Sequence, residues 1–252
     1  MAKSPEREVQ KRLLNEAPRV PGIDIEVSWK PFGDVGGDFY DIFPIEEEAV
    51  AVCLGDISGK GYDAALLMVF ALAELRSMLR EHFRLPYIMS QLDASLKDFT
   101  SNEKFAEVLV GAYVPSIHRF VFVQGGGISP VVFRSRTERL EFYGSSTYRV
   151  PGMALPAGPG RHFAEDSVEL EQGDLMLLFS DGVGERVDAD GKEIVRPDDL
   201  ELGIRTAPSL KKLCESNARG SAEEILQSVI EYLGSLESDP SDDETLIVIK
   251  AE

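Results

Sequence analysis

Hydrophobic and polar positions along the chain predict many short strands and a few helices. Apolar residues at alternate positions over 23–29 indicate a strand, and the unbroken apolar run 49–54 indicates a strand buried on both faces. Residues 63–81 and 86–99 are rich in helix-forming apolar residues and predict two largely covered helices. The same patterns predict further strands at 105–114, 117–123, 130–134, 138–143, 167–170, 175–179 and 246–249, and further helices at 197–217 and 221–234.

The order of these elements indicates the fold class. Strands come in runs and helices in pairs, which is typical of an α+β protein with antiparallel sheets. We expect two antiparallel β-sheets packed as a sandwich with helices on both outer faces, an αββα arrangement. Residues 148–166 are rich in proline and glycine and predict a loop. No internal repeat or linker divides residues 21–252, so we expect one domain there.

Residues 1–20 form a separate leader in this interpretation. Val9, Leu13 and Leu14 lie among charged residues with helical spacing, which predicts a short amphipathic helix ending before Pro18. A helix of this length is not stable alone in water. It must therefore pack on the rest of the chain or on a second copy, which leaves a homodimer open.

Composition narrows the range of partners and compartments. The formal net charge is −18, from 44 acidic and 26 basic residues, and no basic patch is visible, so a nucleic-acid partner is not expected. The N-terminus lacks the apolar core of a signal peptide, and no stretch is long enough for a membrane span. Cys53 and Cys214 are expected to be buried free thiols. A cytoplasmic location follows from these features.

Four segments place aspartate at the end of a predicted strand beside glycine or another small residue. Hard divalent cations prefer oxygen ligands, and clustered carboxylates without a cation would raise each other's pKa, so a set of this kind predicts a metal site. One Asp-Gly pair alone is more often a turn; the prediction depends on all four segments together. They are Gly36-Gly37-Asp38-Phe39-Tyr40-Asp41, Gly55-Asp56-Ile57-Ser58-Gly59-Lys60-Gly61, Ser180-Asp181-Gly182-Val183 and Ser241-Asp242-Asp243-Glu244-Thr245.

One alternative comes from the run Gly36-Gly37-Asp38-Phe39, which superficially matches the signature of diguanylate cyclases. Those enzymes need a carboxylate directly after the aspartate, and Phe39 occupies that position. The cyclase interpretation also leaves the other three aspartate segments unexplained.

In the order and spacing of these motifs, the chain resembles the PPM superfamily of type 2C metal-dependent phosphatases, and within it the SpoIIE/RsbU-like branch. The resemblance covers nearly the whole chain, from Val9-Gln10-Lys11-Arg12-Leu13-Leu14 and Pro21-Gly22 through the four aspartate segments to the last predicted strand.

The resemblance implies a site for two divalent cations, Mn²⁺ or Mg²⁺. Asp56 would bridge both ions, and the backbone carbonyl of Ile57 would bind one of them. Asp38 would bind a metal directly or through water, whereas Asp34 and Asp41 would stand outside the ligand set. Asp181 and Asp242 would complete the second ion's ligands, with Asp243 as the alternative if the register of the final motif differs by one.

The implied activity is hydrolysis of phosphoserine or phosphothreonine on a regulatory protein by a water that bridges the two metals. In this branch the substrates include small anti-sigma-factor antagonists, and the segment matching residues 1–20 links a sensor to the catalytic domain. This suggests a switch role for the leader helix.

Two positions depart from the pattern of relatives. Ser58 stands where type 2C phosphatases carry a histidine, and Gly127 stands where the branch has the histidine of an Asn-Ala-Gly-His sequence. A metal-bound water would then donate the proton to the leaving group. The departures also keep open a second function, a catalytically weak phosphoprotein-binding regulatory module of the same fold.

Overall fold

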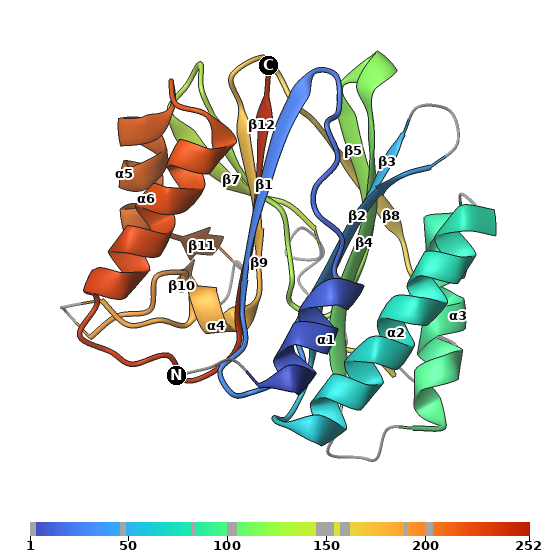
Figure 1. Cartoon of the computed structure of the whole chain (residues 1–252). Helices are drawn as coiled ribbons and strands as arrows, with labels where there is room; N and C mark the ends of the chain where they lie inside the picture. The colour runs from blue at the N-terminus through green and yellow to red at the C-terminus, as the bar shows by residue number, and fades with distance from the viewer. Residues whose placement is uncertain are drawn as a thin grey trace.

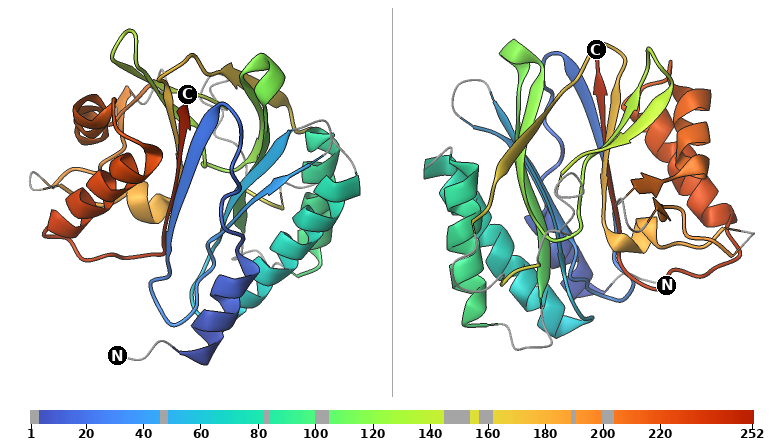
Figure 2. Two further views of the ribbon diagram at one scale, coloured as in Figure 1. Left: turned by 45° about the horizontal axis from the view of Figure 1, so that its top comes forward. Right: turned by 180° about the vertical axis from the view of Figure 1, so that it is seen from behind.

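Two five-stranded β-sheets face each other, with helices on both outer sides (Figure 1). The structure is a computed structural model that describes residues 4–45, 49–81, 84–99, 105–144, 154–156, 162–188, 191–199 and 204–252. Figure 2 shows the same layers from two further directions. The predicted αββα architecture is confirmed.

The first sheet joins segments far apart in the sequence, because its edge strand β1 pairs along its whole length with β12. All neighbouring strands in this sheet are antiparallel. In spatial order they are β1 (Ile23–Lys30), β12 (Glu244–Ala251), β9 (Leu175–Phe179), β6 (Val131–Arg134) and β7 (Arg139–Phe142).

The second sheet is also antiparallel throughout. Its strand β3 lies between β2 and β4, and every residue of β3 except Asp56 is buried. In spatial order its strands are β2 (Phe39–Pro44), β3 (Val50–Ile57), β4 (Ala106–Val114), β5 (Arg119–Gly125) and β8 (Glu165–Glu169).

Helices cover the outer face of each sheet. One pair packs on β2–β5 of the second sheet; in the other pair, α6 packs on β1 and β12 of the first sheet and α5 packs against α6 (Figure 1). The covering pairs are α2 (Tyr62–Glu81) with α3 (Leu85–Lys97), and α5 (Pro208–Asn217) with α6 (Ala222–Ser235). The remaining elements are α1 (Pro5–Leu13), the 3₁₀ helix η2 (Pro115–Ile117), α4 (Asp181–Gly184), β10 (Arg196–Asp199) and β11 (Ile204–Thr206).

The alternation of side chains along a strand explains why three apolar layers form. On β3, Val52 and Leu54 face the other sheet, whereas Ala51 and Cys53 face the helices α2 and α3. Strand β12 divides in the same way between the central layer and the layer under α5 and α6. Each central strand therefore must be apolar on both faces, and this is why its sequence is an unbroken apolar run.

Two predicted segments differ in the structure. The helix expected over 197–217 is wrong in its first half, where β10 and β11 form a small hairpin and α5 begins only at Pro208. Proline suits the first turn of a helix but disfavours helical backbone just before it. Strand β2 was not expected, because Tyr40 and Asp41 interrupt its apolar pattern. The predicted loop at 148–166 lies mainly outside the described residues.

Helix α1 docks on the domain, although with a different face from the predicted stripe. Leu14 is buried and Leu13 is partly buried against the layer under α2, but Val9 is 59% exposed. The buried residue of the helix is instead Gln10, whose side chain donates to the carbonyl of Gly36 at 2.7 Å and accepts from its N–H at 3.1 Å. The leader thus contacts the loop that carries Asp38.

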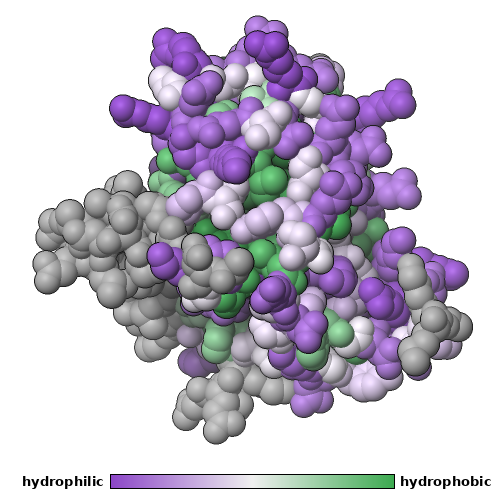
Figure 3. Space-filling model, turned by 90° about the vertical axis from the view of Figure 1, so that its left-hand side faces the viewer, coloured by the Kyte–Doolittle hydropathy of each residue, from purple (hydrophilic) through white to green (hydrophobic). Residues whose placement is uncertain are grey.

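The outer surface over α5 and α6 is largely hydrophilic, with a few hydrophobic side chains between (Figure 3). In the described ranges, no helix has both the length and the apolar character needed to cross a bilayer. Cys53 and Cys214 are both buried and free, as expected.

Candidate metal centre

The four aspartate segments meet at one end of the sandwich, the lower end in Figure 1. Strands β3 and β9 run toward this end, and β12 starts from it, since Phe179 is paired with Leu246. Asp56 is the second-last residue of β3, and Asp181 is the first residue of α4, which follows directly after β9. Both sheets therefore contribute carboxylates to the same place.

Asp38 is buried, and both its carboxylate and its backbone carbonyl are hydrogen-bonded. Its carboxylate oxygen Oδ2 accepts hydrogen bonds from the hydroxyls of Ser180 at 2.6 Å and Thr245 at 2.5 Å. Its backbone carbonyl accepts from the indole N–H of Trp29 at 3.0 Å. Burial, and after it the neighbouring charge of Asp56, raises the pKa of Asp38 well above its usual range.

Asp243 fixes the loop between β1 and β2. Its Oδ1 accepts from the backbone N–H of Phe32 at 2.7 Å, and its Oδ2 accepts from those of Gly37 at 2.6 Å and Asp38 at 3.1 Å. A Cβ atom on Gly36 would collide with the same carboxylate, which explains the first glycine of this motif. Both oxygens of Asp243 are thus engaged by backbone donors.

Close backbone contacts bring the other segments together. A Cβ on Gly37 would collide with the carbonyl oxygen of Ile57, and a Cβ on Gly182 would collide with the carbonyl oxygen of Asp243. The N–H of Ile57 donates to the carbonyl of Gly37 at 3.4 Å. Glycine is required at both positions because the chains approach too closely for any side chain.

Asp56 and Asp181 also have raised pKa values. Burial, followed by the charges of Asp181, Asp242 and Glu107, raises the pKa of Asp56 to about 8. The pKa of Asp181 is also raised, first by burial and then by Asp242, while a hydrogen bond with Asp56 opposes the shift. Each of the two carboxylates therefore ionises less readily in the metal-free protein than a free aspartate does.

Asp242 faces the opposite loop. Its Oδ1 accepts from the N–H of Asp243 at 2.9 Å, and its Oδ2 lies 3.6 Å from the ammonium of Lys60. Within the described part of the chain, no three His, Cys, Asp or Glu side chains are already arranged as a closed metal cage. The aspartates gather at one end, with Asp56 directed to Asp181 and Asp242 directed to Lys60.

The sequence motifs did not single out several residues that support the cluster. Ser180 and Thr245 lie inside the quoted motifs, and only the structure shows that they hold Asp38. Glu107 lies opposite Asp56 on β4, and its position could have been found only from the strand pairing. A Cβ on Gly127 would lie 3.0 Å from the carboxylate of Glu107, so the missing histidine belongs beside this residue.

Arg186 connects α4 to the start of β12. Its guanidinium is 5% exposed, forms an ion pair with Glu244, and donates to the carbonyls of Leu233 at 3.0 Å and Ser238 at 2.5 Å. These bonds fix the end of α6 and the segment that leads to Asp242. A pocket of about 390 Å³ lies beside this network.

Asp34 and Asp41 are the two aspartates of these segments that we expect to stand outside the ligand set. Asp34 is exposed. Asp41 is buried and accepts from Arg76 at 2.6 Å and from Asn15 at 2.6 Å, while Arg76 also donates to the carbonyl of Leu13 at 2.8 Å. Asp41 therefore ties the N-terminal segment to α2.

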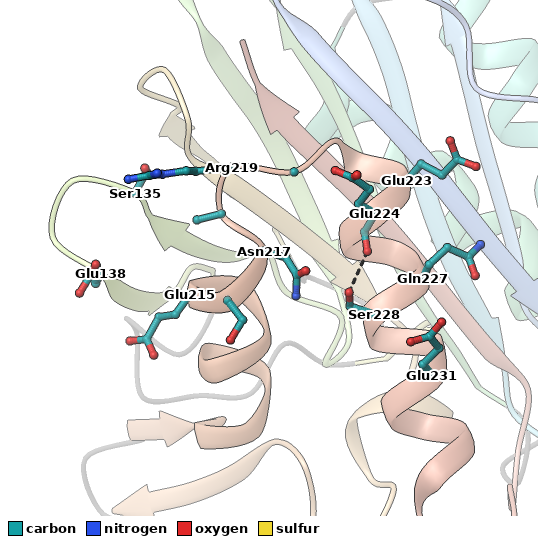
Figure 4. A pocket seen from close by; sticks show the side chains of 13 residues that line it. Ser135, Glu138, Glu215, Asn217, Arg219, Glu223, Glu224, Gln227, Ser228 and Glu231 are labelled. Atoms are coloured by element: carbon teal, nitrogen blue, oxygen red, sulfur yellow. Dashed lines mark hydrogen bonds between the residues drawn. The ribbon is translucent and has the colours of Figure 1, made fainter.

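A larger hollow of about 950 Å³ lies away from the aspartate cluster, between the β6–β7 turn and the helices α5 and α6 (Figure 4). Its walls are mostly polar, and five of the thirteen lining residues are glutamates. Glu224 caps α6 through its bond with the N–H of Ser221, and its carbonyl accepts from Ser228. None of the predicted site residues lines it.

Comparison with known proteins identifies relatives of this chain. Phosphoserine phosphatase RsbU of Bacillus subtilis (strain 168) is 26% identical over 244 residues, which cover 96% of this chain and 68% of RsbU. The SiaA-PP2C domain of Pseudomonas aeruginosa superposes with a TM-score of 0.78 at 17% identity, covering 98% of this chain and 94% of that domain.

The RsbU and RsbW domains of a Mycobacterium tuberculosis protein superpose with a TM-score of 0.75 at 22% identity, covering 94% of this chain and 62% of that one. These structures share the fold. The sequence profile of Stage II sporulation protein E (SpoIIE) matches residues 46–252, which include three of the four aspartate segments. The chain belongs to the SpoIIE family.

Proposed function

We propose that the chain hydrolyses phosphoserine or phosphothreonine on a regulatory protein at the aspartate cluster. The observation that carries this proposal is the pair of Asp56 and Asp181, two carboxylates from different sheets. Burial and the charge of Asp181 raise the pKa of Asp56, whereas burial and the charge of Asp242 raise the pKa of Asp181. Such an arrangement is typical of a functional site, since a fold gains no stability from placing like charges together.

The donor set suits divalent cations. The cluster supplies hard carboxylate oxygens, and the raised pKa values mean that a cation would replace bound protons. We assign Asp38, Asp56, Asp181, Asp242 and the carbonyl of Ile57 as ligands of two Mn²⁺ or Mg²⁺ ions. Asp243 is assigned instead to holding the loop, because backbone N–H groups engage both of its oxygens.

Two such ions, when bound, supply the positive charge that attracts a phosphoryl group and acidifies a water. The protein's part is to keep the ligands in place. Ser180 and Thr245 orient the carboxylate of Asp38, and Asp243 holds the backbone beneath it. Ser58 is assigned no donor role in this scheme; its hydroxyl accepts from the N–H of Phe105 at 2.7 Å.

The first test is activity toward para-nitrophenyl phosphate with and without Mn²⁺. Asp56→Ala and Asp181→Ala are each expected to abolish hydrolysis and weaken Mn²⁺ binding while the chain stays folded, because each removes a ligand that no neighbour replaces. Asp98→Ala removes an exposed carboxylate from the end of α3 and serves as the matched control. Near wild-type turnover of either variant at saturating Mn²⁺ would show that the assignment is wrong.

The substrate class is proposed from the relatives, whose names include a phosphoserine phosphatase and an RsbW domain. A small phosphorylated regulator, such as an anti-sigma-factor antagonist, fits this class. A pull-down with Asp56→Asn as a substrate trap, followed by mass spectrometry of phosphorylated partners, identifies it. If the wild type binds such a partner in Mn²⁺ without removing its phosphate, the chain is the non-catalytic binding module of the same fold.

A further inference from the structure

Lys60 lies at the mouth of the aspartate cluster, on the turn between β3 and α2. Gly59 and Gly61 on either side have φ angles of +101° and +74°, while the space around both is open. Glycine is needed here for backbone conformation and not for lack of room. The two glycines shape a turn that presents the lysine side chain above the end of β3.

The ammonium of Lys60 reaches across to the loops of the other sheet. It donates to the carbonyl of Ser241, lies 3.6 Å from Oδ2 of Asp242, and sits 4.5 Å above the centre of the Phe32 ring. Its side chain is still 51% exposed. Lys60 is therefore in contact with a predicted metal ligand and with solvent at the same time.

The other basic side chains described around this end of the sandwich have partners outside the cluster. Lys30 and Arg186 both pair with Glu244, and Arg76 pairs with Asp41. Lys60 is the basic residue described here whose ion pair is with an aspartate of the cluster.

A phosphate monoester is negatively charged and is repelled by a group of aspartates. Positive charge is therefore needed at the exposed edge of the cluster, where the substrate approaches, as well as among the buried carboxylates. An ammonium on a flexible stem is suited to this role, because it is a compact charge with three donors that can exchange one acceptor for another. The ring of Phe32 faces the ammonium at 4.5 Å in a cation–π contact, which adds to the attraction without taking up one of the three N–H donors in a hydrogen bond to oxygen.

We propose that Lys60 binds the phosphoryl group of the substrate, exchanging the carboxylate of Asp242 for a phosphate oxygen while the Ser241 carbonyl keeps a second donor in place. This inference rests on the proposed phosphatase function and adds a substrate-binding residue to it. The exchange would also release Asp242 toward its proposed role as a ligand.

The test measures inorganic phosphate binding by calorimetry at saturating Mg²⁺, together with Mg²⁺ affinity in the absence of phosphate. Lys60→Met is expected to weaken phosphate binding by about tenfold or more, the effect of losing a charge-assisted hydrogen bond. Lys60→Arg, which keeps the charge, should stay within about threefold of wild type. Lys211→Met is the matched control, since Lys211 is another half-exposed lysine in a single ion pair, with Glu215 on α5.

The proposal also predicts how Lys60→Met changes the affinity for Mg²⁺. Mg²⁺ affinity of Lys60→Met should equal or exceed that of wild type, because the ammonium competes for Asp242. Unchanged phosphate affinity in Lys60→Met would overturn the proposal, as would a loss of Mg²⁺ affinity as large as the loss of phosphate affinity. If wild-type protein binds phosphate but hydrolyses no monoester, the phosphatase function fails, and the phosphate affinities still decide the role of Lys60.

Discussion

Asp56 holds a proton near neutral pH because its surroundings offer little to stabilise a negative charge. It is largely buried on β3, and its near neighbours Asp181, Asp242 and Glu107 are all acidic. A raised pKa in the folded state means that the folded protein binds more protons than the unfolded chain between pH 4 and pH 8, roughly the two pKa values. In metal-free protein, this residue therefore lowers stability as pH rises through that window.

Asp56→Asn is expected to remove this pH dependence. The metal-free variant should melt at a higher temperature than wild type at about pH 8, where Asp56 must ionise, and the difference should shrink at about pH 5, where both side chains are neutral. Thermal unfolding in a chelator at the two pH values measures the effect. The exposed Asp98→Asn variant is the control, and its difference from wild type should be the same at both. If the difference in melting temperature between Asp56→Asn and wild type is also the same at both pH values, the pKa of Asp56 is not raised by its burial and its acidic neighbours.

Ser58 offers a second test at this scale. Its hydroxyl accepts from the N–H of Phe105, and its N–H donates to the carbonyl of Phe105 at 2.8 Å, so the residue joins the end of β3 to the entry of β4. We expect Ser58→Ala to change turnover by less than about tenfold, whereas loss of a general acid typically costs a factor of 10² or more. Steady-state kinetics at saturating Mn²⁺ decides between the two, and a loss of the larger size would place Ser58 among the catalytic groups.

At the scale of elements, α1 is positioned to influence the cluster without contributing a ligand. Gln10 bonds twice to Gly36, and Gly36 lies against the carboxylate of Asp243. Leu14 anchors the helix in the layer under α2. A change in how this helix docks would therefore move Gly36, and through it the loop that carries Asp38.

Replacing Leu13 and Leu14 together with serine tests this connection. We expect the double variant to show altered Mn²⁺-dependent activity or Mn²⁺ affinity, because the helix loses its apolar anchor and with it the position of Gln10. Activity and solution mass are measured beside wild type and beside Val9→Ser, whose side chain is exposed on the same helix. If activity, affinity and mass all match wild type, the helix is a passive leader.

Elements whose own residues determine them were predictable from the sequence. Helix α2 and strand β3 follow from long apolar patterns, and the capping residues Ser221 and Glu224 fix the start of α6. Strand β2 was not predictable in this way, because its buried Asp41 is satisfied only by partners on other elements. The helix predicted over 197–217 is wrong in its first half because the residues before Pro208 form a hairpin and the helix begins only at that proline.

At the scale of the whole molecule, the sequence located the aspartates but not what holds them. The four motifs are local, and their glycines are explained by close backbone contacts. By contrast, Asp243 holds backbone groups more than 200 residues earlier, and Lys60 meets Ser241 across the sandwich. Contacts at such separations depend on the relative placement of two sheets, which no local pattern specifies.

The pairing of β1 with β12 has a consequence for how the protein is made. A ribosome delivers residues 23–30 more than 200 residues before residues 244–251, so β1 has no β12 to pair with until synthesis has passed the rest of both sheets. Asp242, Asp243 and Thr245 arrive in the same late segment. A nascent chain can therefore build the α2–α3 half while it remains unable to assemble the cluster, and activity would appear only after translation of the domain is complete.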